Sequence, residues 1–534
     1  MKITMMILAI LIYMGVMLYI GVRCSKQNKS SDDFYLGGRK LGPLVTAMSA
    51  EASDMSSWLL MGLPGVALIS GVINPGGFAE AVWTAVGLAI GTYINWLIVA
   101  KPIRIYTEKT DSATIPDFFS ARFGDKKGIL TAAAAVFIVV FFIPYTASGF
   151  AGIGKLFNTL FGVDYVLAMA IGAIVVIGYT VAGGFLAASQ TDFVQSIVMT
   201  FALFVIICFG IENAGGLAPI KENILAIDGI GSLGQYFSLT GTDGSYSFLP
   251  IVSTLAWGLG YFGMPHILLR FMAIEDSRKL KLSRRVASVW VVISMAIAIF
   301  IGVIGLNFVL SEGWINLAGE TAEGFDAERI VIYFAKDGIA NLDSFAAIIA
   351  GLILSGILAS TMSTADSQLL AASSSVSENI VKRFIWKDMG VKWQMWLARL
   401  TVVAISVIAF FLALNPDASI FRIVSFAWAG FGAAFGPVVL CALFWRRTNK
   451  WGALAGMVSG AVMVFVWKFV VRTAAKGTIL DIYELLPAFL VSLAAIVIVS
   501  LLTAEPEQEI LSAFDEVKAL CKKKDTDPAA KENA

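Results

Sequence analysis

Residues 42–71 form an apolar stretch long enough to cross a bilayer, yet its middle holds two acids and three hydroxyls. A carboxylate at bilayer depth costs about 2.5–3.5 kcal/mol on insertion scales, so acids there usually face an aqueous cavity or pathway. Pro43 and Pro64 bracket the stretch, and the small residues between them favour an unwound middle whose oxygens can hold a small cation. The alternative is a structural cluster whose polar groups are hydrogen-bonded by neighbouring helices. Packing of that kind requires fewer polar groups than the two acids and three hydroxyls found here. The polar residues are Glu51, Ser53, Asp54, Ser56 and Ser57.

The whole chain has the composition of a polytopic membrane protein. Of its 534 residues, 58% are hydrophobic and 14% are charged, which excludes an ordinary soluble enzyme and a disordered protein. The single histidine, His266, excludes histidine triads and paired-histidine metal sites, and the four scattered cysteines give no disulfide framework. A phosphate-loop lysine motif is missing, and two Gly-x-Gly-x-x-Gly matches, at 229–234 and 258–263, lack a strand-turn-helix setting. We therefore expect no enzyme activity, no cofactor and no nucleic-acid partner.

Apolar windows long enough to span a bilayer occur thirteen times in the sequence. Of the 39 lysines and arginines, 30 lie in the six segments that alternate on one face. This bias predicts the N-terminus outside and the C-terminus in the cytoplasm, although Lys468, Arg472 and Lys476 fall on the outer side. The sequence of residues 504–534 predicts a short cytoplasmic helix followed by a frayed end. The predicted spans are 3–22, 42–71, 78–100, 128–150, 164–184, 189–211, 246–271, 286–310, 343–376, 397–414, 420–445, 452–471 and 482–503.

Two of these spans, 42–71 and 246–271, are interrupted at their centres and lie five spans apart. Interrupted helices at corresponding positions of two halves are typical of inverted-repeat transporters, whose site lies between the halves. We therefore predict an all-α polytopic membrane protein of about 13 helices with a five-plus-five inverted-repeat core. The predicted parts are a first helix and cytoplasmic loop (1–41), repeat 1 (42–211), an extracellular loop (212–245), repeat 2 (246–445), two C-terminal helices (446–503) and a cytoplasmic tail (504–534).

Aromatic side chains near the centres of spans are candidate substrate contacts. Trp257 and Tyr261 are four residues apart, so they share a face of a helical stretch, and with Pro265 they predict an apolar wall with polar tips. Tyr145 is a further aromatic at membrane depth. Membrane tryptophan and tyrosine more often belong to interfacial belts, but the central position of Trp257 and Tyr261 favours a site.

Hydroxyl residues in the ninth span are candidate ion ligands. Ser360, Ser363 and Thr364 are spaced i, i+3 and i+4, so they present a carbonyl and two hydroxyls on one side of a helix. Hard oxygen ligands of this kind suit sodium or a hydrated pathway, although such hydroxyls commonly bond their own helix. Asp192 lies near the start of the sixth span, and its position is compatible with either a site residue or a solvated residue at a helix end.

Seven segments, in order, closely resemble the sodium/solute symporter family. The resemblance covers nearly the whole chain, from about residue 30 to residue 500, and is far more specific than any single motif. The family's fold, thirteen helices with a five-plus-five inverted repeat, agrees with the spans above. The segments are LGGRKLGP, EASDMSSWLLMGLPG, TIPDFFSARFGDK, GGFLAASQTDFVQ, WGLGYFGMPHILLRFMA, MSTADSQLL and AWAGFGAAFGPVVL.

The resemblance implies roles for particular residues. Asp54 matches the family's essential acid in the broken helix, and Asp192 matches an acid linked to sodium coupling. The implied sodium ligands are the backbone oxygens of Ala52, Met55 and Ser360 and the hydroxyls of Ser363 and Thr364. The positions implied to surround the substrate are Ser56, Ser57, Tyr145, Trp257, Tyr261 and Pro265.

Three positions depart from the family pattern. Ser360 replaces an alanine, which is tolerable because the implied contact is a carbonyl. Ser57 stands where the bacterial proline carriers of the family have glycine, so it adds a hydroxyl beside the substrate. Glu51 stands where they have a small residue, so it adds a second ionisable group near the ion path.

The resemblance implies a cell-membrane carrier that couples inward sodium movement to uptake of L-proline by alternating access. Its ligands are then sodium and L-proline, its surroundings the bilayer, and an obligatory protein partner is not expected. Ser57 and Glu51 leave open another small amino or organic acid as substrate, or protons as the coupling ion. A solute sensor is disfavoured by the short tail, which has no output domain, and a channel gains nothing from two broken helices.

Overall fold

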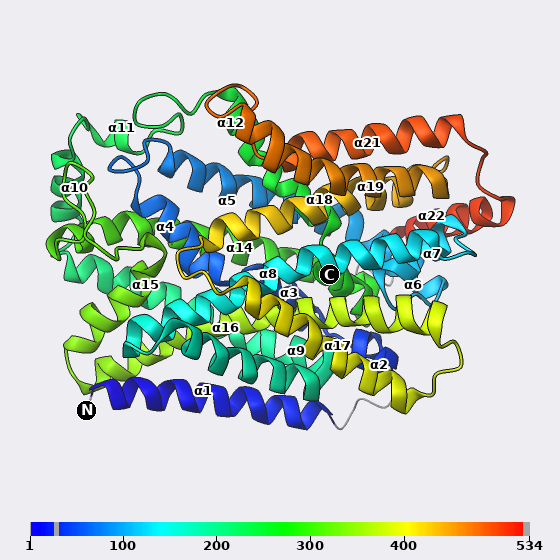
Figure 1. The fold of residues 1–534 in the computed structure, drawn as a ribbon, viewed down its shortest axis with the longest axis horizontal. Helices are drawn as coiled ribbons and strands as arrows, with labels where there is room; N and C mark the ends of the chain where they lie inside the picture. The colour runs from blue at the N-terminus through cyan, green and yellow to red at the C-terminus, as the bar shows by residue number, and fades with distance from the viewer. Residues whose placement is uncertain (1, 26–30, 527–534) are drawn as a thin grey trace.

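The computed structural model describes residues 2–25 and 31–526, and its long helices run side by side along one axis of the molecule (Figure 1). The frayed end predicted for the tail lies outside these residues. Within them, regular secondary structure is helical, and the remaining bridges are isolated. Ten helical runs are long and apolar enough to span a membrane. They are Lys2–Cys24, Gly77–Lys109, Ile129–Phe161, Tyr165–Asn213, Ser277–Ser311, Ser344–Ile385, Val391–Leu412, Ile420–Phe444, Lys450–Ala474 and Leu485–Leu502.

Each predicted span corresponds to a helix of the structure. The interrupted spans contain the shorter apolar helices Trp58–Leu68 and Phe248–Gly263, which lie outside the ten long runs. The run Tyr165–Asn213 supplies two spans, as described below. The spanning elements are α1 (Lys2–Ser25), α3 (Pro43–Asp54), η2 (Trp58–Gly62), α4 (Leu63–Leu68), α5 (Gly77–Ile94), η3 (Asn95–Val99), α8 (Ile129–Phe161), α9 (Tyr165–Asn213), α12 (Phe248–Leu255), η4 (Ala256–Gly263), α13 (Pro265–Ala273), α14 (Leu280–Ser311), α16 (Ser344–Val376), α17 (Val391–Leu412), α18 (Ile420–Phe444), α19 (Lys450–Val466) and α21 (Leu485–Leu502).

Helix α9 reverses direction at Gly184. The backbone there has φ 64° and ψ −167°, a conformation that glycine adopts because it has no Cβ. Before the turn, the Tyr179 hydroxyl donates to Met362 O at 2.8 Å. After it, Gln195 Nε2 donates to the Tyr13 hydroxyl at 3.1 Å, and Tyr13 lies 3.9 Å from Met362 Sδ. Residues 179 and 195 of one straight helix are about 24 Å apart, so their convergence on one level of α16 shows two antiparallel spans, as predicted.

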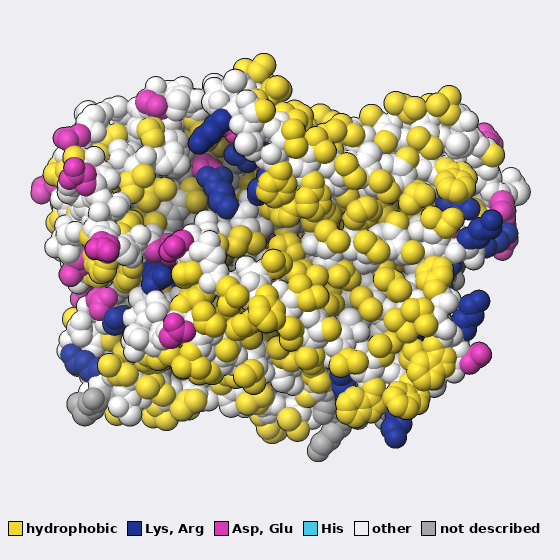
Figure 2. Space-filling view, in the orientation of Figure 1, with side chains coloured by type: hydrophobic (Ala, Val, Ile, Leu, Met, Phe, Trp, Pro, Cys, Tyr) yellow, Lys and Arg dark blue, Asp and Glu magenta, His cyan; other side chains and the backbone are white. Residues whose placement is uncertain are grey.

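Short helices cap the two ends of the bundle. Figure 1 shows α10 and α11 at one end and α6, α7 and α22 at the other. Figure 2 shows hydrophobic side chains over the middle of the same face, with charged side chains mainly toward its ends, as expected for a protein that crosses a bilayer. The α22 helix confirms the predicted tail helix. The shorter elements are α2 (Ser31–Leu36), α6 (Ala100–Lys109), α7 (Ile115–Phe123), α10 (Leu217–Ala226), α11 (Leu233–Tyr236), α15 (Ile330–Tyr333), η9 (Ser377–Ile385), η10 (Trp467–Val471), α20 (Arg472–Ala474) and α22 (Gln508–Thr526).

The all-helical fold and the two interrupted helices are thus confirmed. Most of α16 and most of α18 is buried, which places these two helices at the centre of the bundle. Helices α1 and α19 leave much of their surface outside the packed core. The two interrupted helices meet at one end of the bundle. Leu41 N, just before α3, donates to Ala273 O at 3.1 Å, and Glu275 N donates to Leu41 O at 3.0 Å.

Glycines allow the second interrupted helix to pack directly on α5. A Cβ at Gly258 would lie 2.2 Å from Gly87 O, and one at Gly91 would lie 2.3 Å from Gly258 O. Real side chains cannot occupy such space without a shift of backbone. The Gly-x-Gly-x-x-Gly match at 258–263 is therefore a packing motif within a membrane helix.

Gly258→Ala is expected to destabilise the fold by about 1–3 kcal/mol, the usual cost of overpacking a close-packed interior. The thermal unfolding midpoint of detergent-purified protein measures this effect. Gly178→Ala is the matched control, since a Cβ at Gly178 meets nothing within 4 Å. Equal midpoints for the two variants would contradict the packing role of Gly258.

Candidate functional site

The site begins where the two interrupted helices lose their regular hydrogen bonding. Helix α3 ends at Asp54, Met55 has φ −83° and ψ 72°, and helical structure resumes at Trp58. In the second helix, the 3₁₀ segment η4 ends at Gly263 and α13 begins at Pro265. Both breaks are buried, so their free backbone groups are available to ligands within the protein.

Oxygens from α3 and α16 meet at the first break. The Ser363 hydroxyl donates to Ala52 O at 2.7 Å and to Ser360 O at 3.1 Å. The Thr364 hydroxyl lies 3.5 Å from Ala52 O and 3.1 Å from Ser360 O. Four of the five predicted sodium ligands are therefore in contact, and all four are hard oxygen donors that suit Na⁺.

Met55, the fifth predicted ligand, lies directly after this group in the chain. Its N–H donates to Glu51 O at 2.9 Å at the C-terminal end of α3, and its side chain contacts the Ser294 hydroxyl. The described hydrogen bonds that join Ser363 and Thr364 to α3 go to the carbonyl of Ala52 rather than to that of Met55. The participation of the Met55 carbonyl stays a prediction.

Asp54 connects the two breaks. Its Oδ2 accepts a hydrogen bond of 2.5 Å from the Tyr261 hydroxyl of η4. Its backbone oxygen accepts from the Tyr145 hydroxyl at 3.1 Å and from Trp58 Nε1 at 3.2 Å. Its Oδ1 is buried without a partner among the described residues. Two predicted substrate residues thus converge on Asp54, Tyr261 on its carboxylate and Tyr145 on its backbone oxygen.

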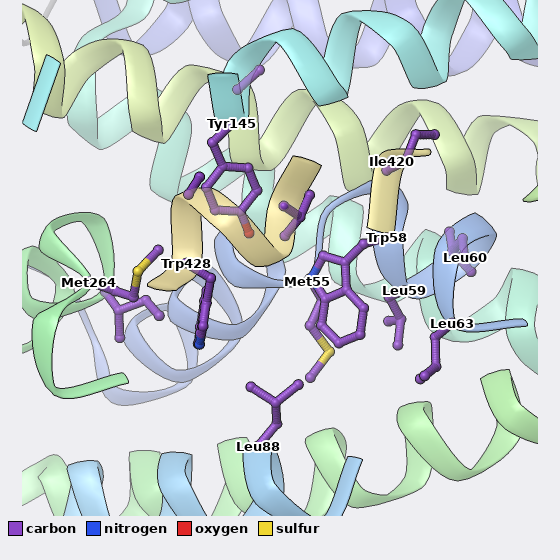
Figure 3. Close-up of a cluster of buried hydrophobic side chains, with 14 of the residues drawn as sticks. Met55, Trp58, Leu59, Leu60, Leu63, Leu88, Tyr145, Met264, Ile420 and Trp428 are labelled. Carbon is purple, nitrogen blue, oxygen red and sulfur yellow. The ribbon is translucent and has the colours of Figure 1, made fainter. Parts of the chain in front are cut away.

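Aromatic rings enclose the space between the breaks. The ring of Trp257 stacks on Tyr483 with centroids 5.3 Å apart and lies 6.1 Å from Trp58. Tyr261 meets the edge of Trp428 at 5.1 Å, and Trp428 Nε1 donates to Trp257 O at 2.7 Å. Figure 3 shows Trp58, Trp428 and Tyr145 reaching this region from three different elements.

The remaining predicted substrate residues border the same breaks. Ser56 lies in the first break, where its Oγ is 3.4 Å from Trp58 N. The Ser57 hydroxyl is buried and has no partner among the described residues. Pro265 is the first residue of α13 and is buried. Their contacts with a substrate stay predictions.

Asp192 lies in a buried ion-pair network, so the alternative of a solvated helix end is wrong. Its Oδ2 accepts from the Ser49 hydroxyl at 2.6 Å and from Arg270 at 3.1 Å. Arg270 also donates to Ser367, whose hydroxyl donates to Asp366 at 3.0 Å. One cation therefore connects two acids, and hydrogen bonds link α3, α9, α13 and α16 at this point.

Comparisons with known proteins agree with this arrangement. The Sodium:solute symporter family matches residues 34–460, which is most of the chain. The chain belongs to this family. The osmoregulated proline transporter OpuE of Bacillus subtilis is 40% identical over 97% of this chain and 99% of its own. The sodium/proline symporter of Haemophilus influenzae is 42% identical, with 95% and 96% covered, and that of Escherichia coli is 40% identical, with 97% of each covered.

Solved structures show the same fold at low sequence identity. A substrate-bound, outward-open Na⁺-coupled sialic acid symporter matches with a TM-score of 0.75 and 18% identity over 94% of this chain and 99% of that one. Mhp1, a nucleobase-cation-symport-1 family transporter, matches with a TM-score of 0.54 and 15% identity over 91% of this chain and 98% of that one. These similarities support the transporter fold of this symporter-family chain.

Four residues of the site were missed in the sequence. Arg270 and Asp366 carry the buried network, and Trp428 and Tyr483 complete the aromatic wall. Three of them lie within segments that identify the family, so a signal existed: Arg270 and Asp366 are charged residues inside apolar spans. Tyr483 has no such signal, because a tyrosine at the start of a predicted span is typical of an interfacial belt.

Glu51 is buried beside the site and is held by α5 and η3. Its Oε1 accepts from Thr92 at 3.1 Å and from Trp96 Nε1 at 3.0 Å. Its Oε2 has no partner among the described residues. The carboxyl therefore belongs to the core next to Asp54, and its role in coupling stays a prediction.

Contacts close the site from both ends of the bundle. At one end, Lys155 Nζ lies 2.8 Å from Glu328 Oε2, and Glu328 accepts from the Phe421 N–H at 3.1 Å, beside the Trp257 ring. At the other end, Arg39 donates to Met272 O at 2.8 Å. The residues of both breaks are consequently shielded from solvent.

Proposed function

We propose that this protein is a symporter that couples inward Na⁺ movement to uptake of L-proline by alternating access. The observation that carries the proposal is the contact of Ser363 with Ala52 O at 2.7 Å, across the break of α3. Relatives at about 40% identity over nearly the full chain are named as proline transporters or sodium/proline symporters, which supports the substrate and the ion.

The proposed Na⁺ ligands are Ala52, Met55 and Ser360 through their carbonyls and Ser363 and Thr364 through their hydroxyls. In this structure the two hydroxyls donate hydrogen bonds to the carbonyls, Ser363 to Ala52 O and Thr364 to Ser360 O. A cation between them turns all of these oxygens toward itself, so Na⁺ joins α3 to α16 as the hydrogen bonds now do. Asp54 and Asp192 act nearby by supplying negative charge in a buried region.

The proposed substrate site lies between the two breaks. L-Proline carries no net charge, so its carboxylate needs local donors, which the Ser57 hydroxyl and the N-terminal end of the helix Trp58–Leu68 supply. Its ring packs on Trp257 and Tyr261, with Tyr145, Ser56 and Pro265 around it. Trp428 stiffens this wall through its hydrogen bond to Trp257 O.

Sodium supplies the free energy of accumulation. One sodium that crosses 100 mV releases about 2.3 kcal/mol, and a tenfold concentration gradient adds about 1.4 kcal/mol. Together these concentrate a neutral solute on the order of 500-fold at one-to-one stoichiometry. We place the protein in the cell membrane with α22 in the cytoplasm, since the end of the bundle that holds α22 carries most of the basic residues.

Proteoliposomes with an inward Na⁺ gradient are expected to accumulate radiolabelled L-proline transiently, because the gradient drives the solute uphill until it dissipates. An equal K⁺ gradient at matched membrane potential is the control and should give equilibration only. An inward proton gradient without Na⁺ tests the alternative that protons are the coupling ion, which the additional carboxyl of Glu51 leaves open. Failure to accumulate proline in every arm would point to another solute, and a panel of small amino acids would then identify it.

A further inference from the structure

An apolar groove lies on the outside of the bundle where α17 begins. It has a volume of about 330 Å³ and lies between η9 and α17. Its walls are three tryptophans with aliphatic and methionine side chains, and Trp386 and Trp393 lie 6.0 Å apart. The tryptophans Trp386, Trp393 and Trp396 are 46%, 59% and 57% exposed, so residues 2–25 and 31–526 leave this groove uncovered.

Three basic residues border the groove. Lys387 follows Trp386 in the chain, and Lys392 and Arg399 lie on one side of α17 next to Trp396, at i−4 and i+3 from it. In the part of the chain that the structure describes, these three have no hydrogen-bond or ion-pair partner, and Arg399 Nε is buried without one. The only acid between them is Asp388, so the border is net positive.

This lack of partners distinguishes the three residues from other cations nearby. Lys382 pairs with Glu378 at 2.7 Å, and Arg383 donates to Asp125 O at 2.7 Å. Arg399 lies about 10 Å further along α17 than Lys392, at 1.5 Å per residue, and so is inside the spanning helix. A cation near the start of a spanning helix extends toward the membrane surface, where anionic headgroups are available as partners.

We propose that this groove binds an anionic phospholipid of the leaflet in which α17 begins. The acyl chain packs against the three tryptophans, and the phosphate is held by Lys387, Lys392 and Arg399. Apolar walls with a positive border match both parts of such a lipid, and basic sites between helices at this membrane surface typically bind anionic headgroups. The inference concerns binding alone, and it holds whatever solute the protein carries.

Native mass spectrometry of the full chain, titrated with phosphatidylglycerol or with phosphatidylcholine, tests the proposal. Each basic residue near an anionic surface contributes about fivefold to binding, so the first phosphatidylglycerol is expected to bind on the order of a hundredfold more tightly than phosphatidylcholine. The double variant Lys387→Gln/Lys392→Gln should lose about thirtyfold of this preference. Lys281→Gln/Arg285→Gln, which removes two exposed charges at the start of α14, should keep it.

Tryptophan quenching locates the lipid without relying on the charge variants. In nanodiscs, brominated phosphatidylglycerol should quench the protein more than an equal amount of brominated phosphatidylcholine. The difference should disappear when Trp386, Trp393 and Trp396 are replaced by phenylalanine, which keeps the walls apolar. Equal quenching by the two lipids, or equal effects of the two charge variants, would overturn the proposal.

Discussion

Replacing Ser363 with alanine is expected to raise the Na⁺ concentration for half-maximal proline uptake by about 10- to 100-fold. The hydroxyl contacts Ala52 O and Ser360 O, so its loss removes both a proposed ligand and the link between α3 and α16. A buried oxygen of this kind contributes about 1–3 kcal/mol, which corresponds to about 5- to 150-fold and includes the stated range. The double variant Ser363→Ala/Thr364→Ala should abolish stimulation by Na⁺. Initial rates in proteoliposomes over a series of Na⁺ concentrations measure the effect.

Ser355→Ala is the matched control for this experiment. Ser355 is equally buried on the same helix, but its hydroxyl donates to Gly351 O at 2.9 Å, within its own helix. Its replacement changes neither the break of α3 nor the proposed ligands, so Na⁺ dependence should stay near that of the wild type. If Ser363→Ala left the Na⁺ dependence unchanged, or if Ser355→Ala altered it as strongly, the ligand assignment would fail.

The spans and the hydroxyl ligands could be predicted because their signals are local. A window of apolar residues identifies a span by itself, and Ser360, Ser363 and Thr364 share one turn of one helix. The interruptions of the two helices could also be predicted, since glycine, proline and acidic residues within an apolar stretch are unfavourable in a continuous membrane helix. Even the two antiparallel spans of α9 followed from windows 164–184 and 189–211, although one helix assignment covers both.

Pairings between distant segments could not be predicted in this way. Arg270 meets Asp192 at a separation of 78 residues and Ser367 at 97, and Trp428 meets Trp257 at 171. Each residue alone is compatible with many partners, so only the packed bundle decides which groups meet. The same limit applies to Asp192, which the sequence left as either a site residue or a helix end.

Arg270→Gln is expected to cause the largest loss of stability. Asp192 and Asp366 are both fully buried, and Arg270 is the cation that contacts the first directly and the second through Ser367. Removing one partner of a buried ion pair typically costs about 3–5 kcal/mol, because the remaining charge is left uncompensated. The thermal unfolding midpoint in detergent should therefore fall well below that of the wild type, and the yield of folded protein should fall with it.

A second substitution separates lost charge balance from lost packing. In Arg270→Gln/Asp192→Asn the network again has one cation fewer but also one acid fewer, so its net charge returns to that of the wild type. The midpoint should recover in part, which a purely steric role of the arginine does not allow. Arg285→Gln removes an exposed cation and should leave the midpoint unchanged. A double variant no more stable than Arg270→Gln would mean that Arg270 acts through shape, including its contact with the Phe185 ring at 4.9 Å, and not through charge.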